Sequence, residues 1–311
     1  MNVFHLISIG VLAASGLAGR AEALAINAAV APDAANEAKT AIEPRWRIRG
    51  AASDLPNVAA RSDLSGLEPA TLSFARDDIA GTDTAHLNLV VGMRLGPSSR
   101  VWEAYPFVSY QRKETTGTGD IDTFTPGMVI AYRKFEEHLA VRIRGEFSYV
   151  IDSEQSSEQV KARVYIEPGV ILGDRHALFG QVWHVPLEGG RLDILPELTI
   201  IGDLSDVRDP GSNPAFQGGG SYRGIGADFS MRLALGGFRN LDLSGWSLVA
   251  GRRQMWFSGD IVPDDPGRTH ASLEYSWDAA PVGIALTYSK GRNDDTFQAE
   301  DTLSLDLTWR R

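Results

Sequence analysis

The sequence predicts an all-β chain that folds as a transmembrane antiparallel up-and-down β-barrel of about twelve strands, with fourteen strands as the alternative. First, apolar and polar residues alternate through most of the chain after residue 84, as in strands with one apolar and one polar face. Second, the alternating segments run to about 10 to 13 residues, roughly twice the usual length in globular proteins. Third, aromatic residues collect near the segment ends, as at membrane interfaces: Tyr132, Phe147, Tyr149, Trp277, Tyr288 and Trp309.

The N-terminus has the layout of a secretory signal peptide, which we predict over residues 1–23, with cleavage after residue 25 as a second option. An apolar run from Leu6 to Ala18 is followed by small residues, and the run is too short to cross a membrane as a helix. The residues before this run include no Lys or Arg, which departs from the usual signal. The alternative interpretation is a buried N-terminal helix.

Residues 24–83 are predicted to form a disordered periplasmic leader with a possible short strand. Residues 24–45 are rich in Ala and show no sustained period. Residues 46–49 and 71–75 each begin a strand pattern, but Gly and Pro interrupt both segments. The barrel domain is therefore predicted over residues 84–311.

Twelve segments supply the predicted strands of the barrel. Nine of them alternate cleanly: 86–95, 123–133, 139–151, 160–172, 191–201, 224–235, 271–278, 282–290 and 302–311. Three lose their phase partway: 102–114, 177–187 and 244–259. We interpret the loss of phase as β-bulges near Pro106, Gly180 and Gly251.

The connections between these segments predict an orientation. If the C-terminus lies in the periplasm, the long connections 203–222, 260–268 and 292–301 lie outside the cell, and the short connections 236–240 and 278–280 lie inside. Further back along the chain this order of long and short connections weakens. The weakening indicates that one strand between residues 177 and 222 is assigned wrongly.

Two other folds compete with the barrel. A helix would spread Arg142, Arg144 and Glu146 around its circumference, whereas a strand places all three on one side. A soluble antiparallel sandwich also alternates, so it is the stronger competitor. The length of the segments and the aromatic residues at their ends favour the membrane barrel.

From about residue 84 to residue 311, together with the leader, the chain resembles bacterial outer-membrane β-barrel proteins as a broad class. The most specific element is the final strand, with Leu303, Leu305, Leu307 and Trp309 on one face. This strand is similar to the C-terminal signal that the barrel-assembly machinery reads. The resemblance implies a place in the outer membrane of a Gram-negative bacterium, contact with outer-membrane lipid and lipopolysaccharide, and assembly by that machinery.

Charged residues on the polar faces are balanced in sign, and we predict that they line the lumen. The basic set is Arg94, Arg142, Arg144, Lys161, Arg163, Arg191, Arg232 and Arg310. The acidic set is Glu146, Glu167, Asp193, Glu197, Asp228, Glu274, Asp278 and Asp306. The balance favours pairs that brace neighbouring strands around a narrow or occluded lumen. The alternative is a selective constriction, in which an Arg-rich wall at residues 142, 144, 161 and 163 faces acidic residues across a small pore.

One pair of residues has the spacing of a hydrolytic site. His270 and Ser272 lie two residues apart on one strand face, where a His can activate a Ser nucleophile. Both are predicted to point into the lumen, away from lipid, and Leu273 stands where phospholipase-like motifs have Asn. We therefore predict no catalytic residue and treat a lipid hydrolase as the least favoured hypothesis.

Composition excludes several classes of function. The chain has no Cys, so it has neither disulfides nor Cys-ligated metal. Four further His residues lack the spacing of metal ligands: His86, His138, His176 and His184. We therefore expect no metal and no cofactor. A net charge of −10 argues against a nucleic-acid partner. The leading hypothesis is a narrow passive channel or transport protein, and the second is a structural or export-associated barrel with an occluded lumen.

Overall fold

The structure, a computed structural model, describes residues 46–56, 70–77, 82–96, 101–115, 120–135, 139–172, 176–177, 179, 182–188, 190–213, 216–238, 245–260, 267–277, 282–292 and 299–309. All of them belong to one unit that spans Pro44–Arg311. The predicted signal peptide and residues 24–45 of the predicted leader lie outside the described residues. Within these ranges, no helix has both the length and the apolar character needed to cross a membrane.

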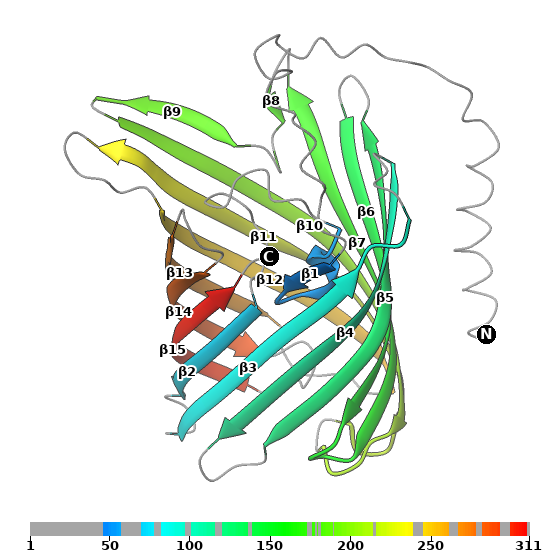
Figure 1. The fold of residues 1–311 in the computed structure, drawn as a ribbon. Coiled ribbons are helices and arrows are strands. Elements are labelled where there is room, and N and C mark those ends of the chain that lie inside the picture. Colours follow the sequence, from blue (N-terminus) through cyan, green and yellow to red (C-terminus); the bar gives the residue numbers. More distant parts are fainter. Residues whose placement is uncertain are drawn as a thin grey trace, which may run out of the picture. The chain divides into compact units, whose positions relative to one another are not determined.

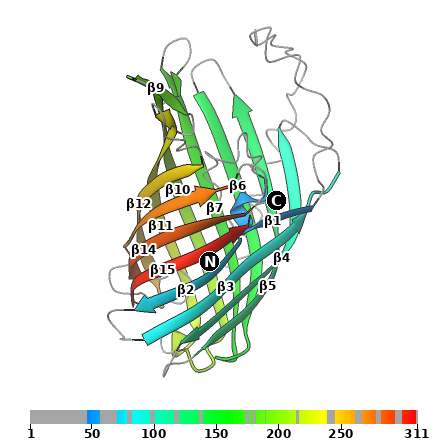
Figure 2. The same cartoon turned by 60° about the vertical axis from the view of Figure 1, so that its left-hand side comes forward.

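Twelve antiparallel strands close into a barrel (Figures 1 and 2). The ladder runs from β2 to β7, continues from β7 to β10 and on to β15, and β15 pairs with β2 to close the ring. The wall strands are β2 (Ala70–Asp77), β3 (Thr82–Met93), β4 (Trp102–Thr115), β5 (Ile121–Phe135), β6 (Leu139–Asp152), β7 (Ser157–Leu172), β10 (Gly190–Asp209), β11 (Gly220–Phe238), β12 (Trp246–Gly259), β13 (Arg268–Ser276), β14 (Val282–Arg292) and β15 (Ala299–Trp309). The predicted fold class is confirmed, with twelve strands in the wall.

One wall strand differs from the predicted set. β2 belongs to the ring, so the barrel begins at Ala70, inside the range predicted as leader. The segment predicted as a strand at 177–187 is not a wall strand; it contains β9 (Trp183–Leu187), which pairs with the first residues of β10. The short strand β8 (His176–Ala177) pairs with the end of β7. The sequence shows only a weak strand pattern there, at 71–75, and the structure extends it to the eight residues of β2.

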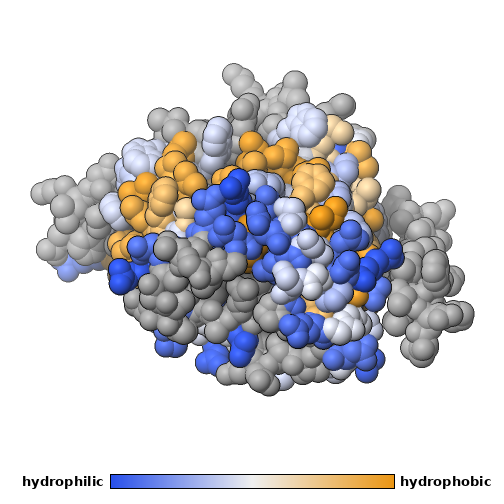
Figure 3. Space-filling view, turned by 90° about the horizontal axis from the view of Figure 1, so that it is seen from below, coloured by the Kyte–Doolittle hydropathy of each residue, from blue (hydrophilic) through white to orange (hydrophobic). Residues whose placement is uncertain are grey.

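The apolar face of the wall strands points away from the lumen. On β15 the residues of the predicted assembly signal are about half exposed: Leu303, Leu305, Leu307 and Trp309. Further exposed apolar side chains lie on β5, β11 and β14: Phe124, Ile130, Ile225, Phe229, Ile284 and Leu286. Figure 3, a view onto one end of the barrel, shows hydrophobic residues on the flank and hydrophilic residues over the end face. A closed ladder with an apolar exterior suits the hydrocarbon of a membrane.

Substitution of Leu305 by Arg tests this lipid-facing surface. Leu305 lies near the middle of the exposed face of β15, so we expect Leu305→Arg to lower the free energy of unfolding by about 2–4 kcal/mol. Urea unfolding in phospholipid vesicles, followed by tryptophan fluorescence, measures the change. The control is Ser304→Arg on the lumen side of the same strand, which we expect to be milder. Equal destabilisation by both variants would argue against a lipid-facing exterior.

Two of the predicted bulges are absent. β4 pairs with β5 through Pro106 without a register shift, and β12 pairs with both of its neighbours without a shift at Gly251. The third, near Gly180, lies outside the described residues. Alternation is lost on β4 and β12 because apolar residues of both strands face the lumen. These residues are Tyr105 and Phe107 on β4, and Met255 and Phe257 on β12.

The connection predicted at residues 203–222 is shorter than expected. β10 continues to Asp209 and β11 begins at Gly220, so the connection spans residues 210–219. Within it, Phe216 is fully buried and packs against Val207, Tyr222 and the partly buried Phe257. The end of this connection therefore folds inward over the mouth of the barrel, and residues predicted to be in a loop belong to the wall.

Candidate functional site

Residues 46–56, which we name the inner segment, enter the lumen from the end of the barrel at which β15 finishes (Figures 1 and 2). Strand β1 (Trp46–Arg49) pairs with Val90–Met93 of β3, beyond the part of β3 that pairs with β2. The chain then turns inward. The side-chain amide of Asn88 donates a hydrogen bond to the carbonyl oxygen of Gly50 at 3.0 Å. A short helical turn, Ala52–Asp54, follows and is buried.

An apolar cluster holds the inner segment against the wall. Leu55 is fully buried and, together with Ala52 of the same segment, belongs to a cluster with residues of β3, β4 and β5: Val90, Tyr105, Phe107 and Val129. Gly92 makes the close approach possible, because a Cβ atom at this position would lie 2.5 Å from a methyl carbon of Leu55. Close packing between the segment and the wall therefore requires Gly at position 92.

Arginines of the wall bind the backbone of the inner segment. Nη1 of Arg144 donates to the carbonyl oxygen of Ser53 at 2.5 Å and to Oδ1 of Asp54 at 3.0 Å. Arg133 donates to the carbonyl oxygen of Pro56. These charge-assisted bonds satisfy carbonyl groups that the short turn leaves without partners in its own backbone.

The inner segment also carries arginines of its own. Nη1 of Arg47 donates to the carbonyl oxygen of Leu55 at 2.5 Å, which ties the two ends of the segment together. The guanidinium of Arg47 lies over the ring of Tyr105, 5.1 Å from its centroid. Arg49 is also buried. The segment thus combines apolar packing, hydrogen bonds and a cation–π contact, and it occupies part of the lumen.

Charge pairs follow the wall between nearby strands. Arg142 and Arg144 of β6 both pair with Glu167 of β7. Arg163 lies 2.7 Å from its register partner Asp203, and Arg253 is 2.8 Å from its register partner Asp228. Other pairs join strands that are neighbours or next neighbours: Arg133 with Glu103 at 2.9 Å, and Arg232 with Glu274 at 2.6 Å. These pairs brace the wall.

The remaining residues of the predicted charge ladder have other surroundings. Three of the carboxylates accept a hydrogen bond from a hydroxyl group: Glu146 from Tyr165 at 3.4 Å, Glu197 from Ser230 at 3.3 Å, and Asp306 from Thr287 at 2.7 Å. Arg191 and His184 both contact Asp193, near the end of the barrel where β9 pairs with β10. Arg94 and Lys161 are buried, and Arg310 and Asp278 lie outside the described residues.

Several residues of the site escaped the sequence-based prediction. They are Asp54 of the inner segment and Glu103, Arg133, Asp203 and Arg253 of the wall. Glu103 and Arg253 lie on strands that lose their alternation, and Asp203 was assigned to a loop. The loss of alternation was the available signal, because inward-facing apolar residues on a barrel strand indicate material packed inside the lumen.

The candidate hydrolytic residues, His270 and Ser272, are not hydrogen-bonded to each other. Ser272 donates its hydroxyl to Oε1 of Glu274 at 3.1 Å. The ring of His270 lies beside Gly251 of β12, where an added Cβ would approach its Cε1 to 2.5 Å. Among the described residues, no group of three or more His, Asp or Glu side chains could hold a metal ion.

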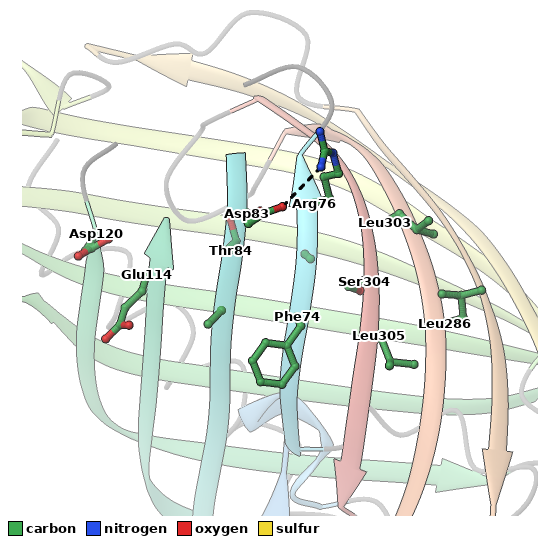
Figure 4. Close-up of a pocket in the computed structure, with 12 residues that line it drawn as sticks. Phe74, Arg76, Asp83, Thr84, Glu114, Asp120, Leu286, Leu303, Ser304 and Leu305 are labelled. Atoms are coloured by element: carbon green, nitrogen blue, oxygen red, sulfur yellow. Dashed lines mark ion pairs between the residues drawn. The ribbon is translucent and has the colours of Figure 1, made fainter. Parts of the chain in front are cut away.

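A shallow concavity of about 730 Å³ lies where β2, β3, β14 and β15 approach the barrel end opposite the inner segment (Figure 4). Its larger apolar side chains belong to the exposed outer face: Phe74, Leu286, Leu303 and Leu305. Arg76 and Asp83 form an exposed ion pair at its edge, with 3.9 Å between their charged atoms. The concavity is therefore part of the exterior surface, and we place the candidate site in the lumen.

Comparisons with known proteins return barrels of several kinds. An outer membrane channel from Pseudomonas putida F1 is similar at 10% identity over 86% of this chain and 93% of that chain, with a TM-score of 0.42. The β domain of the Bordetella autotransporter BrkA shares 10% identity over 77% and 96% of the two chains, with a TM-score of 0.36. LpxR from Salmonella typhimurium shares 11% identity over 77% of this chain and 98% of that chain, with a TM-score of 0.34.

No family model matches the chain, and no curated protein matches it. The geometry carries the assignment of class instead. An even number of antiparallel strands closes into a ring, its exterior is apolar and its interior is charged. This is the architecture of outer-membrane β-barrel proteins, and the charged interior around the inner segment is the candidate functional site.

Proposed function

We propose that this protein is a narrow passive channel for small polar solutes in the outer membrane of a Gram-negative bacterium. The course of the charge pairs carries the proposal, because they join neighbouring or next-neighbouring strands along the wall. Pairs that follow the wall do not cross to its far side, and in this proposal an aqueous path runs past them. A barrel of twelve strands is also intermediate in width. It is wider than the small barrels whose interior is filled by side chains, and narrower than the 16- to 18-stranded barrels with wide aqueous channels.

The inner segment supplies the constriction in this proposal. It lies against β3 to β6 on one side of the lumen, where Arg144 links Asp54 to Glu167. A solute that passes this level meets guanidinium and carboxylate groups in nearly equal number. A mixed lining favours small polar solutes and gives little preference for ions of one sign.

Single-channel recording in planar lipid bilayers tests the proposal. We expect the full chain to produce a small, steady open level with weak ion selectivity, because the lumen is polar but narrowed. The same preparation after heat denaturation is the control. A folded, inserted protein that never shows a steady open level would reject the channel.

A second candidate is a structural barrel with an occluded lumen, and a specific observation favours it. Phe216 packs over the mouth at one end, while the inner segment fills part of the other. Ser212 donates its backbone NH to the carbonyl of Gln155 at 2.8 Å, which holds the connection 210–219 inward. An occluded barrel predicts no conductance in the full chain.

A further inference from the structure

The ladder between β7 and β10 stops well before either strand ends. Its last register pair toward the inner-segment end is Ile166 with Ile200, although β7 continues to Leu172 and β10 begins at Gly190. Within the described part of the chain, residues 167–170 and 195–199 have no register partner across this gap in the ladder, which we name the seam. Figure 1 shows β9, β10 and β11 leaning away from β7 and β8 at this end.

Each side of the seam carries a proline. Pro168 pairs with Val141 of β6, and Pro196 pairs with Met231 of β11, so each keeps its partner on the side away from the seam. A proline lacks the NH that a ladder requires and is tolerated at strand edges. The two prolines therefore keep the seam from closing as a regular ladder. Unpaired strand edges at membrane depth persist only where protein or water satisfies their backbone groups.

The lumen side of the seam is charged. Glu167 lies on the β7 side and Glu197 on the β10 side, and both face inward. Glu197 is partly buried, and its charged neighbours are two carboxylates and two arginines: Glu167, Asp54 of the inner segment, Arg142 and Arg232. Glu167 and Asp54 are ion-paired with Arg144, whereas the contact of Glu197 is the hydroxyl of Ser230. Glu197 is thus the carboxylate of this cluster whose direct contact is a hydroxyl and not a guanidinium.

The outer side of the seam is apolar. Leu198 faces outward on the β10 side and has Phe229 of β11 as its register partner. The ring of Phe179, from the connection between β8 and β9, meets Phe229 edge-on, with 6.5 Å between centroids. The outer side of the seam on the β10 side is therefore lined by three apolar residues: Leu198, Phe229 and Phe179. An apolar exterior next to a carboxylate whose direct contact is a hydroxyl matches a molecule with a hydrocarbon tail and a cationic head.

We propose that the seam is a lateral opening through which cationic amphiphiles pass between the lumen and the membrane. The head group binds at Glu197 while the hydrocarbon tail remains against Leu198 and Phe229. The inference rests on the proposed function, since it adds a cargo class and a second route to the same channel. It also predicts that this cargo enters the lumen from the bilayer, without passing either mouth of the barrel.

A disulfide across the seam tests the route. The register of β7 and β10, if continued, would place residue 168 opposite residue 198, so Pro168→Cys with Leu198→Cys closes the seam on oxidation. The chain contains no other Cys. The matched control is Ala162→Cys with Leu204→Cys, a register pair on the same face and the same strands but inside the ladder. The probe is dodecyltrimethylammonium, partitioned into a planar phosphatidylcholine bilayer.

We expect dodecyltrimethylammonium to reduce the small-ion current of the full chain and of the oxidised control. In the oxidised seam variant we expect the small-ion current to persist and the block to disappear, and a reductant to restore the block. Equal block in both oxidised variants would overturn the lateral route. A current that the probe never reduces would overturn it too, while the channel itself would stand.

Substitution at Glu197 tests the head-group site without any crosslink. We expect Glu197→Gln to weaken binding of the probe at least about tenfold, and Glu197→Asp to retain most of it. The control is Asp306→Asn on β15, a lumen carboxylate that also accepts a hydroxyl hydrogen bond. Binding is measured by equilibrium dialysis on protein in lipid nanodiscs, so it is readable even if the protein proves not to conduct. Equal affinity in the Glu197→Gln protein would overturn the assignment of the site.

Discussion

Deletion of residues 46–56 is expected to raise single-channel conductance several-fold. The inner segment fills part of the lumen, and the conductance of a pore grows with its free cross-section. The change is measured in planar bilayers with the same salt for both proteins. If the full chain is occluded and only the deletion variant conducts, the inner segment is the element that closes the barrel.

Two further variants make the interpretation specific. A deletion of equal length within residues 24–45 is the control, and we expect it to leave conductance unchanged. Leu55→Asp places a charge in the apolar cluster against Val90 and Val129, so it should displace the inner segment without shortening the chain. Unchanged conductance in both the deletion variant and the Leu55→Asp protein would show that the segment does not restrict the lumen.

Arg144→Met is expected to lower the free energy of unfolding by about 3–5 kcal/mol. Arg144 is buried, pairs with both Asp54 and Glu167, and binds the carbonyl of Ser53. Its loss removes the cation that Asp54 and Glu167 share, while Glu167 keeps its pair with Arg142. Urea unfolding in phospholipid vesicles measures the effect, and the loss of the contact to the inner segment should also raise the conductance.

Arg253→Met provides the matched control for Arg144→Met. Arg253 also pairs with a lumen carboxylate, Asp228, but its side chain is one-third exposed. We expect a smaller loss of stability, on the order of 1 kcal/mol or less, because water still screens the remaining charge. Equal effects of the two substitutions would show that the contacts to the inner segment add nothing to the stability of the barrel.

The residues beside the seam show which parts of the site could be predicted from the sequence. Arg142, Arg144 and Glu167 were predicted to line the lumen because they stand on the polar faces of cleanly alternating strands, and the structure brings them together. Pro168 and Pro196 were visible in the sequence as well. Their meaning was not, because a proline on a strand shows where an edge is tolerated only after the neighbours of that strand are known.

The inner segment shows the opposite case. Residues 46–56 have no lasting period, because their contacts are with carbonyl groups, arginines and a small apolar cluster rather than with a regular ladder. Tyr105 and Phe107 disrupted the alternation of β4, and the sequence offered a bulge as the local explanation. The distant partner, Leu55, was the physical cause.

By itself, the sequence determined that this chain forms long strands with one apolar and one polar face, because a period of two is a local property of the backbone. It also predicted a wall of about twelve strands and part of the set of charges that such faces turn inward. Only the tertiary structure decided that β2 replaces the segment at 177–187, that residues 46–56 enter the lumen, and that the ladder opens between β7 and β10. Those features depend on which distant segments meet, and no local pattern encodes contacts made across the barrel.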